Sequence, residues 1–317
     1  MKSENNSGSI NVEVGGRLGN QMFQYAFARA LQEKYYPNYS LNLCFRLTEK
    51  GGAAGKSGGG TDGWGNDLKL FHVVPYNEVS SIKLPLRQMI LCGRYFLENR
   101  IIKKEDAELQ AQRYLQPHGI YSSRKSHYIP AEKSDSRFIY IRGRFEAHEY
   151  FDSIRSKLIS EFTPLAPAPD KNRNLLEKIQ STESVCVTIR RGDFYKQGNE
   201  NFQVCSKDYF YRAMQSIHES IPNARFFIFS DEVEMIKKEF HFPYSVEYES
   251  GHDSVDEKIR LMSSCKHFVI SNSTFSWWVQ YLSVNPDKIV CIPSIWRRGD
   301  EDCSGMYLPY MRKINVE

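Results

Sequence analysis

Long apolar runs are absent from this 317-residue sequence, so no segment reaches the roughly 20 residues needed to cross a bilayer. The first ten residues, MKSENNSGSI, also lack the apolar core of a secretory signal. Charge of one sign is in small excess, because 42 Lys and Arg face 38 Asp and Glu, a net charge of +4. Nucleic-acid-binding proteins usually have a stronger basic bias. We therefore expect a cytoplasmic protein without a nucleic-acid partner.

Cysteine occurs without the spacing of a functional motif. The chain has seven, an odd number, and no two form a Cys-x-x-Cys pair, which argues against a disulfide framework or a zinc site. Cys186 and Cys291 lie in apolar runs and are expected to be buried. No group of His, Asp and Glu has metal-ligand spacing, and we interpret the acidic triplet 300–302 as a solvated surface run. The sequence predicts no metal site.

Length and composition indicate two globular domains. About 150 residues per domain suggests two domains for 317 residues, and the 41% hydrophobic content is ordinary. Residues 164–172 contain three prolines within six residues and are predicted to be the linker. Residues 51–65 hold eight of the 20 glycines and are predicted to be a flexible loop or insertion. Within that stretch, 51–57 resembles a P-loop but is one residue too short.

Strands and helices are expected to alternate, most regularly after the linker. In the first half, alternating Ile10, Val12 and Val14 predict a strand, followed by a glycine turn and a helix from Asn20 to about Lys34. Another helix is expected over 98–115. In the second half, the predicted strands are 185–189, 225–229, 267–270 and 288–292, and the predicted helices are 207–220, 232–240, 256–265 and 274–282. This α/β pattern is typical of a parallel sheet covered on both faces.

Polar residues follow three of these strands. Arg190 and Arg191 follow the first, Asp231 the second, and residues 271–274 (SNST) the third. Ligands bind at the carboxyl ends of parallel strands, so these residues are expected along one rim that holds a nucleotide diphosphate. Each has a purely structural alternative, namely an ion pair for the arginines and helix caps for the others. The glycine turn 15–21 is expected to close this cleft from the other domain.

Four blocks in chain order carry a family resemblance. They are GRLGNQMFQYA at 16–26, IRRGD at 189–193, FSD at 229–231 and SNSTFSWW at 271–278. These blocks resemble the signature blocks of glycosyltransferase family 11, the α-1,2-fucosyltransferases, and they span most of the chain.

The resemblance implies a GT-B fold, in which two Rossmann-like domains face each other across a cleft. On this likeness, residues 1–164 form the acceptor-side domain and 165–317 the donor-binding domain. It implies an inverting galactoside α-1,2-fucosyltransferase that moves L-fucose from GDP-L-fucose to a galactose 2-hydroxyl, with neither metal nor cofactor. The role implied is glycan or surface polysaccharide synthesis.

The resemblance also implies the site residues. Arg190 would bind the donor's β-phosphate, where negative charge grows as the sugar leaves, and Asp231 would lie near the nucleoside. The other residues implied to contact the donor are Arg17, Gly19, Asn20, Ser273 and Thr274. A general base for the acceptor hydroxyl is not identified; Asp193, Glu146 and His148 are candidates, and a departing phosphate oxygen is the alternative.

Two departures from the family pattern bear on the donor. Thr188 stands where the family usually has His, and Lys258 stands where it often has an acidic residue. Guanine recognition is then expected to fall to Asp256 or Glu257. These departures keep open a transferase that uses another nucleotide sugar, or a glycan-binding protein without turnover. A lipid-linked acceptor would place the protein peripherally at the inner membrane.

Overall fold

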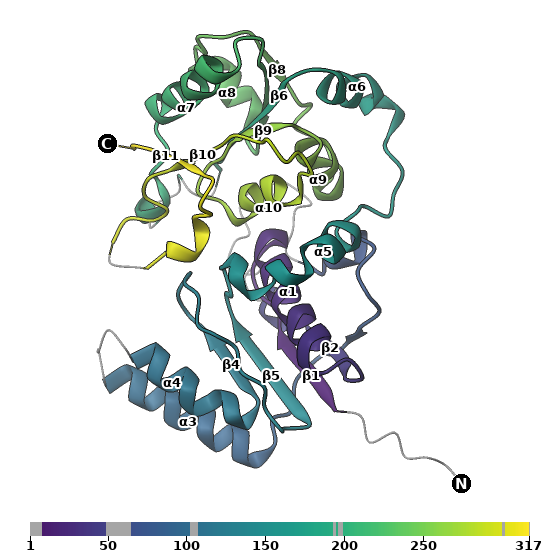
Figure 1. Ribbon diagram of the computed structural model, residues 1–317, viewed down its shortest axis with the longest axis vertical. Coiled ribbons are helices and arrows are strands. Elements are labelled where there is room, and N and C mark those ends of the chain that lie inside the picture. The colour runs from purple at the N-terminus through teal and green to yellow at the C-terminus, as the bar shows by residue number, and fades with distance from the viewer. Residues whose placement is uncertain are drawn as a thin grey trace. The chain divides into compact units, whose positions relative to one another are not determined.

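The computed structural model describes residues 8–48, 65–101, 107–192, 195, 199–299 and 302–316. The chain forms two compact units, shown in Figure 1. Unit 1 comprises Met1–Lys69 and Val73–Leu158, and unit 2 comprises Leu70–His72 and Ile159–Glu317. The boundary at residue 158 lies six residues before the predicted boundary at 164. The glycine-rich segment 51–64, with its P-loop-like stretch, lies outside the described residues.

Unit 1 contains a five-stranded parallel sheet in the order β3-β2-β1-β5-β4. Burial of Ile10, Val12 and their neighbours on both sides of β1 explains its central place. The strands are β1 (Ser9–Glu13), β2 (Ser40–Cys44), β3 (Asn77–Glu78), β4 (Ile120–Ser123) and β5 (Phe138–Gly143), and the helices α1 (Leu18–Tyr35), α3 (Leu86–Ile101) and α4 (Ala107–Leu115).

Two of the predicted helices in unit 1 need correction. Helix α1 begins at Leu18, so Arg17 and not Asn20 is its N-cap residue. The predicted helix 98–115 is two helices, and α3 begins twelve residues earlier than predicted. Helix α3 was missed because it carries apolar residues on its solvent side as well as on its packed side, which hides a one-sided helical period.

Unit 2 contains a six-stranded parallel sheet in the order β11-β10-β9-β6-β7-β8. Its central strand, β6 (Ser184–Ile189), is buried at every position. The other strands are β7 (Arg225–Ser230), β8 (Val246–Tyr248), β9 (His267–Val269), β10 (Val290–Pro293) and β11 (Arg312–Ile314). The helices are α5 (Arg155–Glu161), which straddles the unit boundary, α6 (Arg173–Ser181), α7 (Lys207–Ser220), α8 (Val233–Glu239), α9 (Val255–Ser263) and α10 (Thr274–Leu282).

The α/β prediction with parallel sheets is confirmed in both units. Trp277 and Trp278 are fully buried, and Trp277 stacks on Tyr281 with ring centroids 4.9 Å apart. Cys186 and Cys291 are buried as expected, and all seven cysteines are free. Within the described residues, no helix is long and apolar enough to cross a membrane.

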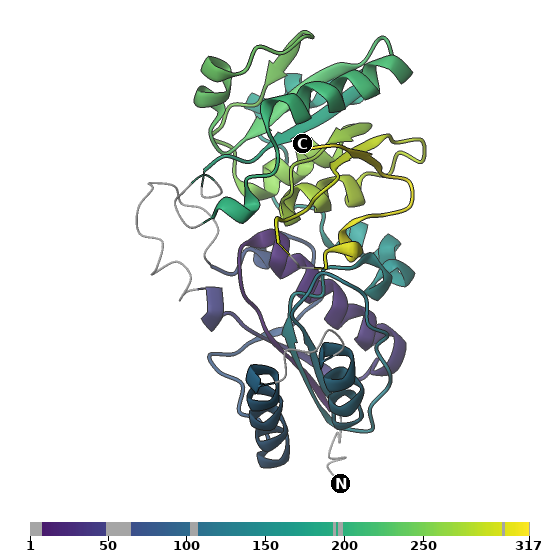
Figure 2. The ribbon, with the colours of Figure 1, turned by 90° about the vertical axis from the view of Figure 1, so that its left-hand side faces the viewer.

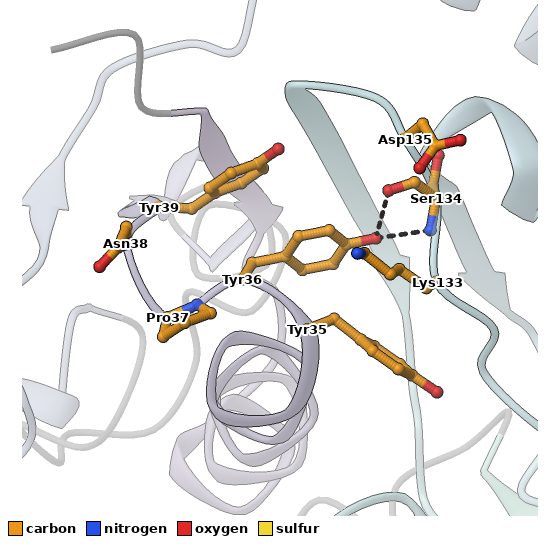
Figure 3. A pocket seen from close by; sticks show the side chains of 8 residues that line it. All are labelled: Tyr35, Tyr36, Pro37, Asn38, Tyr39, Lys133, Ser134 and Asp135. Atoms are coloured by element: carbon orange, nitrogen blue, oxygen red, sulfur yellow. Dashed lines mark hydrogen bonds between the residues drawn. The ribbon is translucent and has the colours of Figure 1, made fainter.

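Three tyrosines at the end of α1 anchor the segment that leads into β5 (Figure 3). The hydroxyl of Tyr36 donates to the Ser134 carbonyl at 3.1 Å and accepts from the Ser134 N–H at 2.7 Å. The hydroxyls of Tyr35 and Tyr39 donate to the carbonyls of Ala131 and Ser136. A cavity of about 290 Å³ remains beside them. Because these hydroxyls are committed to backbone, we assign the tyrosines a structural role.

We expect His267 to make unit 2 sensitive to acid. Its buried ring accepts the Ile289 N–H at Nδ1, 3.0 Å away, and burial lowers its pKa below 6.5. Above pH 6.5 the neutral ring contributes its full stability, which is lost as the pH falls through the lowered pKa. Thermal unfolding at a series of pH values should therefore show a steeper fall in Tm on acidification for the wild type than for His267→Gln.

The control is His241→Gln, because His241 is exposed. Parallel Tm profiles for the wild type and His267→Gln would contradict the assignment.

Candidate functional site

The carboxyl ends of three neighbouring strands bring the predicted polar residues of unit 2 to one edge. Strand β6 pairs with β7 on one side and with β9 on the other. The Thr188 hydroxyl accepts the Ser271 N–H at 3.0 Å, and the Ser230 hydroxyl donates to the Ile189 carbonyl at 2.7 Å. The loops after β6, β7 and β9 therefore form one rim, as the sequence predicted.

Arg190 is held by Asp231 across this rim. The guanidinium Nη1 lies 3.0 Å from Asp231 Oδ2, and Asp231 Oδ1 accepts the Arg191 N–H at 2.9 Å. Both side chains are 22% exposed. One carboxylate thus fixes the arginine side chain and the backbone that carries it. Asp193, a candidate general base that follows this arginine pair, lies outside the described residues.

Arg191 contacts different residues from Arg190. Its guanidinium lies over the ring of Tyr195 at 4.3 Å and over that of Phe240 at 5.1 Å. The side chain is buried, so these cation–π contacts take the place of solvent around its charge. Arg191 therefore anchors the loop, which leaves Arg190 as the partly exposed cation of the pair.

The loop between β9 and α10 contains a buried residue followed by two half-buried ones. Asn272 is buried, and its amide donates to the carbonyls of Phe202 at 2.9 Å and Trp296 at 3.0 Å. Ser273 is the N-cap residue of α10, yet its side chain forms no cap hydrogen bond. Ser273 and Thr274 are half-buried. Two hydroxyls therefore lie beside the N-terminus of a nine-residue helix, an arrangement that suits an anion.

The two departures from the family pattern have structural partners. Thr188 is buried, and its hydroxyl accepts a hydrogen bond from the Ser271 N–H. Thr188 therefore links the end of β6 to the loop that follows β9. Lys258 Nζ lies 3.7 Å from Oε1 of Glu249, a buried carboxylate whose pKa is raised mainly by burial. The pairing gives this lysine a partner within unit 2.

The two acidic residues beside Lys258 differ. Glu257 accepts from Asn172 at 3.1 Å and from Arg260 at 2.8 Å, so both of its oxygens are in use. Asp256 lies in the first turn of α9 and is 7% exposed. Among the residues that the structure describes, none forms a hydrogen bond or ion pair with its carboxylate. Of the two, Asp256 is the one with acceptor capacity to spare.

The glycine turn of unit 1 is held by residues that sequence reasoning missed. Gly16 has φ +77°, and a Cβ there would lie 2.4 Å from Asn20 Nδ2, which requires glycine. The buried amide of Gln24 accepts the Gly15 N–H at 2.9 Å and donates to the Gly143 carbonyl at 3.0 Å. A glutamine within an otherwise apolar helix face was the signal for this role.

Arg17, Gly19 and Asn20 all lie where α1 begins. The Arg17 carbonyl accepts the N–H groups of Asn20 at 2.9 Å and Gln21 at 3.1 Å. Arg17 and Asn20 are half-buried and Gly19 is buried. The turn between β1 and α1 thus positions the two polar side chains at the carboxyl edge of this sheet.

The two described base candidates are already engaged. Glu146 is buried and accepts from the Ser126 hydroxyl at 2.5 Å. The hydrogen bond that the His148 ring donates to the Asp152 carboxylate raises the pKa of His148 above 6.5. A raised pKa keeps His148 protonated over a wider pH range and opposes a role as general base. No group of three or more His, Cys, Asp or Glu in the described part of the chain could hold a metal.

Comparison with known proteins decides the family. A model described as "Glycosyl transferase family 11" matches residues 80–301, which is more than half of the chain. The chain belongs to glycosyltransferase family 11. It is therefore a glycosyltransferase, and the parallel sheets of its two units confirm the α/β part of the predicted fold class.

Two curated proteins of Escherichia coli are similar over nearly their whole length. An alpha-1,2-colitosyltransferase is 27% identical over 311 residues, covering 92% of this chain and 93% of the relative. The O-antigen biosynthesis glycosyltransferase WbnK is 25% identical over 310 residues, covering 90% and 94%.

Solved structures of fucosyltransferases are more distant. NodZ alpha-1,6-fucosyltransferase, crystallised with GDP and known from Bradyrhizobium, has a TM-score of 0.47 and 13% identity, covering 86% of this chain and 92% of that one. POFUT1 in complex with GDP-fucose has a TM-score of 0.45 and 13% identity, covering 91% and 99%.

In this glycosyltransferase, Gly192→Ala should displace the Arg190 guanidinium while leaving the charge of Arg190 in place. A Cβ at residue 192 would lie 2.4 Å from Asp231 Oδ2, so the carboxylate must move and its bond to Arg190 must weaken. We expect GDP affinity to fall at least about tenfold, because a charge-assisted hydrogen bond contributes about 1.5–3 kcal/mol. Calorimetric titration with GDP measures this.

Gly93→Ala is the matched control, since a Cβ there meets nothing within 4 Å. Unchanged GDP affinity in Gly192→Ala, with the fold intact, would contradict a positioning role for Asp231.

Proposed function

We propose that this protein is an inverting α-1,2-fucosyltransferase, which moves L-fucose from GDP-L-fucose to the 2-hydroxyl of a galactoside. Membership of family 11 supports the reaction class, and the "alpha-1,2" in the name of one relative supports the linkage. The name of the other relative supports a role in O-antigen or related surface polysaccharide synthesis.

The arrangement of Arg190 at the end of β6 carries this proposal. Breaking the bond between fucose C1 and the diphosphate leaves negative charge on the β-phosphate. A preorganised cation lowers the energy of that charge in the transition state without reorganising. Asp231 already holds the Arg190 guanidinium in place at 3.0 Å. We assign Arg190 to the β-phosphate, and Ser273, Thr274 and the N-terminus of α10 to the same diphosphate.

The remaining donor contacts are assigned by chemistry and by the family motif. Guanine presents two adjacent N–H donors, which suit a carboxylate, and Asp256 is the acidic residue of α9 with acceptor capacity to spare. Asp231 forms an ion pair with Arg190. We therefore assign Asp231 to the edge of the nucleoside site. From unit 1, the motif residues Arg17, Gly19 and Asn20 are assigned to the donor as well.

The acceptor hydroxyl must lose a proton as it attacks C1 from the face opposite the diphosphate. We assign this proton to Asp193, with a departing phosphate oxygen as the alternative. With Arg190 as a permanent cation at the diphosphate, the proposed reaction requires neither a metal nor another cofactor. Activity in EDTA tests that part directly.

A second donor is favoured by one specific observation, the colitosyltransferase among the relatives. Colitose is fucose without its 3-hydroxyl, so diphosphate-binding residues cannot distinguish the two sugars. Parallel kinetics with GDP-fucose and GDP-colitose decide between them, and the donor with the higher kcat/KM is the native class. In either case a lipid-linked acceptor would bring the protein to the cytoplasmic face of the inner membrane.

The experiment that tests the proposal is GDP release from GDP-fucose, with and without lactose or N-acetyllactosamine, in EDTA. We expect release that depends on the acceptor. Arg190→Ala should lower kcat by roughly 10²–10³, the cost of removing one preorganised donor.

Arg173→Ala is the matched control, because Arg173 is an exposed arginine of the same unit paired with Asp170. Near-normal turnover by Arg190→Ala would refute the phosphate assignment. Binding of GDP-fucose without GDP release, under any acceptor tried, would instead favour a glycan-binding protein.

A further inference from the structure

Helix α3 has apolar side chains on two opposite faces. One face carries Leu91 and Tyr95, which pack against Leu115 of α4 and Tyr140 of β5. Helix α3 lies at the edge of unit 1 in Figures 1 and 2, and its opposite face is exposed. It carries Leu86 (67% exposed), Met89 (53%), Ile90 (61%) and Leu97 (63%).

This exposed stripe is unusual within the molecule. Six large aliphatic side chains are exposed in the described part of the chain, and four of them lie on α3. Residues 86, 90 and 97 fall on one side of a helix, with 89 next to them, so the four form a continuous surface. Scattered apolar residues on a surface are ordinary, but a continuous group marks an interaction site.

The charges around the stripe are mostly positive, although Asp135 lines a hollow with Arg87 and Glu98 follows Leu97 in the sequence. Lys83, Arg87 and Arg94 are exposed, and residues 79–97 contain no Asp or Glu. Arg87 and Arg94 are seven residues apart and therefore flank the stripe on the same edge. Arg94 also lies over the ring of Tyr114 on α4, with its Cζ 5.6 Å from the ring centroid. Tyr114 is itself exposed and extends the surface.

We propose that the exposed face of α3 binds the surface of an anionic phospholipid bilayer. The aliphatic side chains enter the boundary between headgroups and acyl chains, while the flanking cations bind lipid phosphates. This pairing of an apolar stripe with basic edges is the composition that interfacial helices require. The inference is independent of the donor and linkage proposed above, because vesicle binding does not require turnover.

A second copy of the chain fits this face less well. Most protein dimers are twofold symmetric, so the patch would face its own copy. Lys83, Arg87 and Arg94 would then approach their own equivalents, and Asp135 beside Arg87 would offset this positive excess only in part. An anionic lipid surface supplies the missing negative charge, so charge complementarity favours the bilayer.

Co-sedimentation of the full chain with vesicles tests the proposal. The vesicles are phosphatidylcholine alone and phosphatidylcholine enriched in phosphatidylglycerol. We expect stronger partition onto the anionic vesicles. Leu86→Gln with Leu97→Gln should abolish it. Arg87→Gln with Arg94→Gln should weaken it by roughly 25-fold, since each cation near an anionic surface contributes a factor of about five.

Matched controls carry the same changes elsewhere on the surface. Leu165→Gln with Val284→Gln replaces two exposed aliphatic side chains of unit 2, and Arg225→Gln with Lys238→Gln removes two exposed cations. These variants should partition like the wild type, and circular dichroism should show that every variant is folded.

Three results would overturn the proposal. The first is no partition of the wild type onto either vesicle. The second is partition that the α3 variants leave unchanged. The third is a dimer in size-exclusion chromatography that Leu86→Gln with Leu97→Gln converts to a monomer without any vesicle binding, which would make this face an interface between copies.

Discussion

The pairing of β6 with both of its neighbours is the constraint on which the proposed donor site depends. Because β6 is buried at every position and lies between β7 and β9, the register of three parallel strands decides which loop residues meet. The Asp231 carboxylate reaches Arg190 and the Arg191 N–H only in this register. A cation whose position is set by a sheet rather than by its own flexible chain is already ordered before a ligand arrives.

The organisation of unit 2 was predictable because it follows local rules. Apolar runs alternate with helical patterns, and parallel strands bring their carboxyl ends together, so the rim followed from the order of elements alone. The burial of Trp277 and Trp278 followed in the same way from a helix rich in apolar residues. The family motifs then predicted a donor-binding chemistry for residues that composition shows only to be polar.

Other features depend on contacts between residues far apart in the sequence. The stacking of Arg191 against Phe240 joins positions 49 residues apart, and no local pattern announces it. The same holds for Asn172, which bridges Asp253 and Glu257. The start of helix α3 was predicted wrongly for a different reason. Its exposed face is apolar, whereas solvent-facing positions of a helix are usually polar. Sequences depart from these local rules most often at surfaces that have a function in addition to stabilising the fold.

The amide of Gln24 has a consequence for how this protein can vary. It joins the backbone at residue 15, after β1, to the backbone at residue 143, the last residue of β5. The Gln24 side chain can form both hydrogen bonds only when residues 15 and 143 keep their present positions. An insertion next to either residue would therefore disturb the hydrogen bonding of this amide. Changes of length in unit 1 should accumulate elsewhere in the chain, while these two turns keep their residue count even in relatives whose sugars differ.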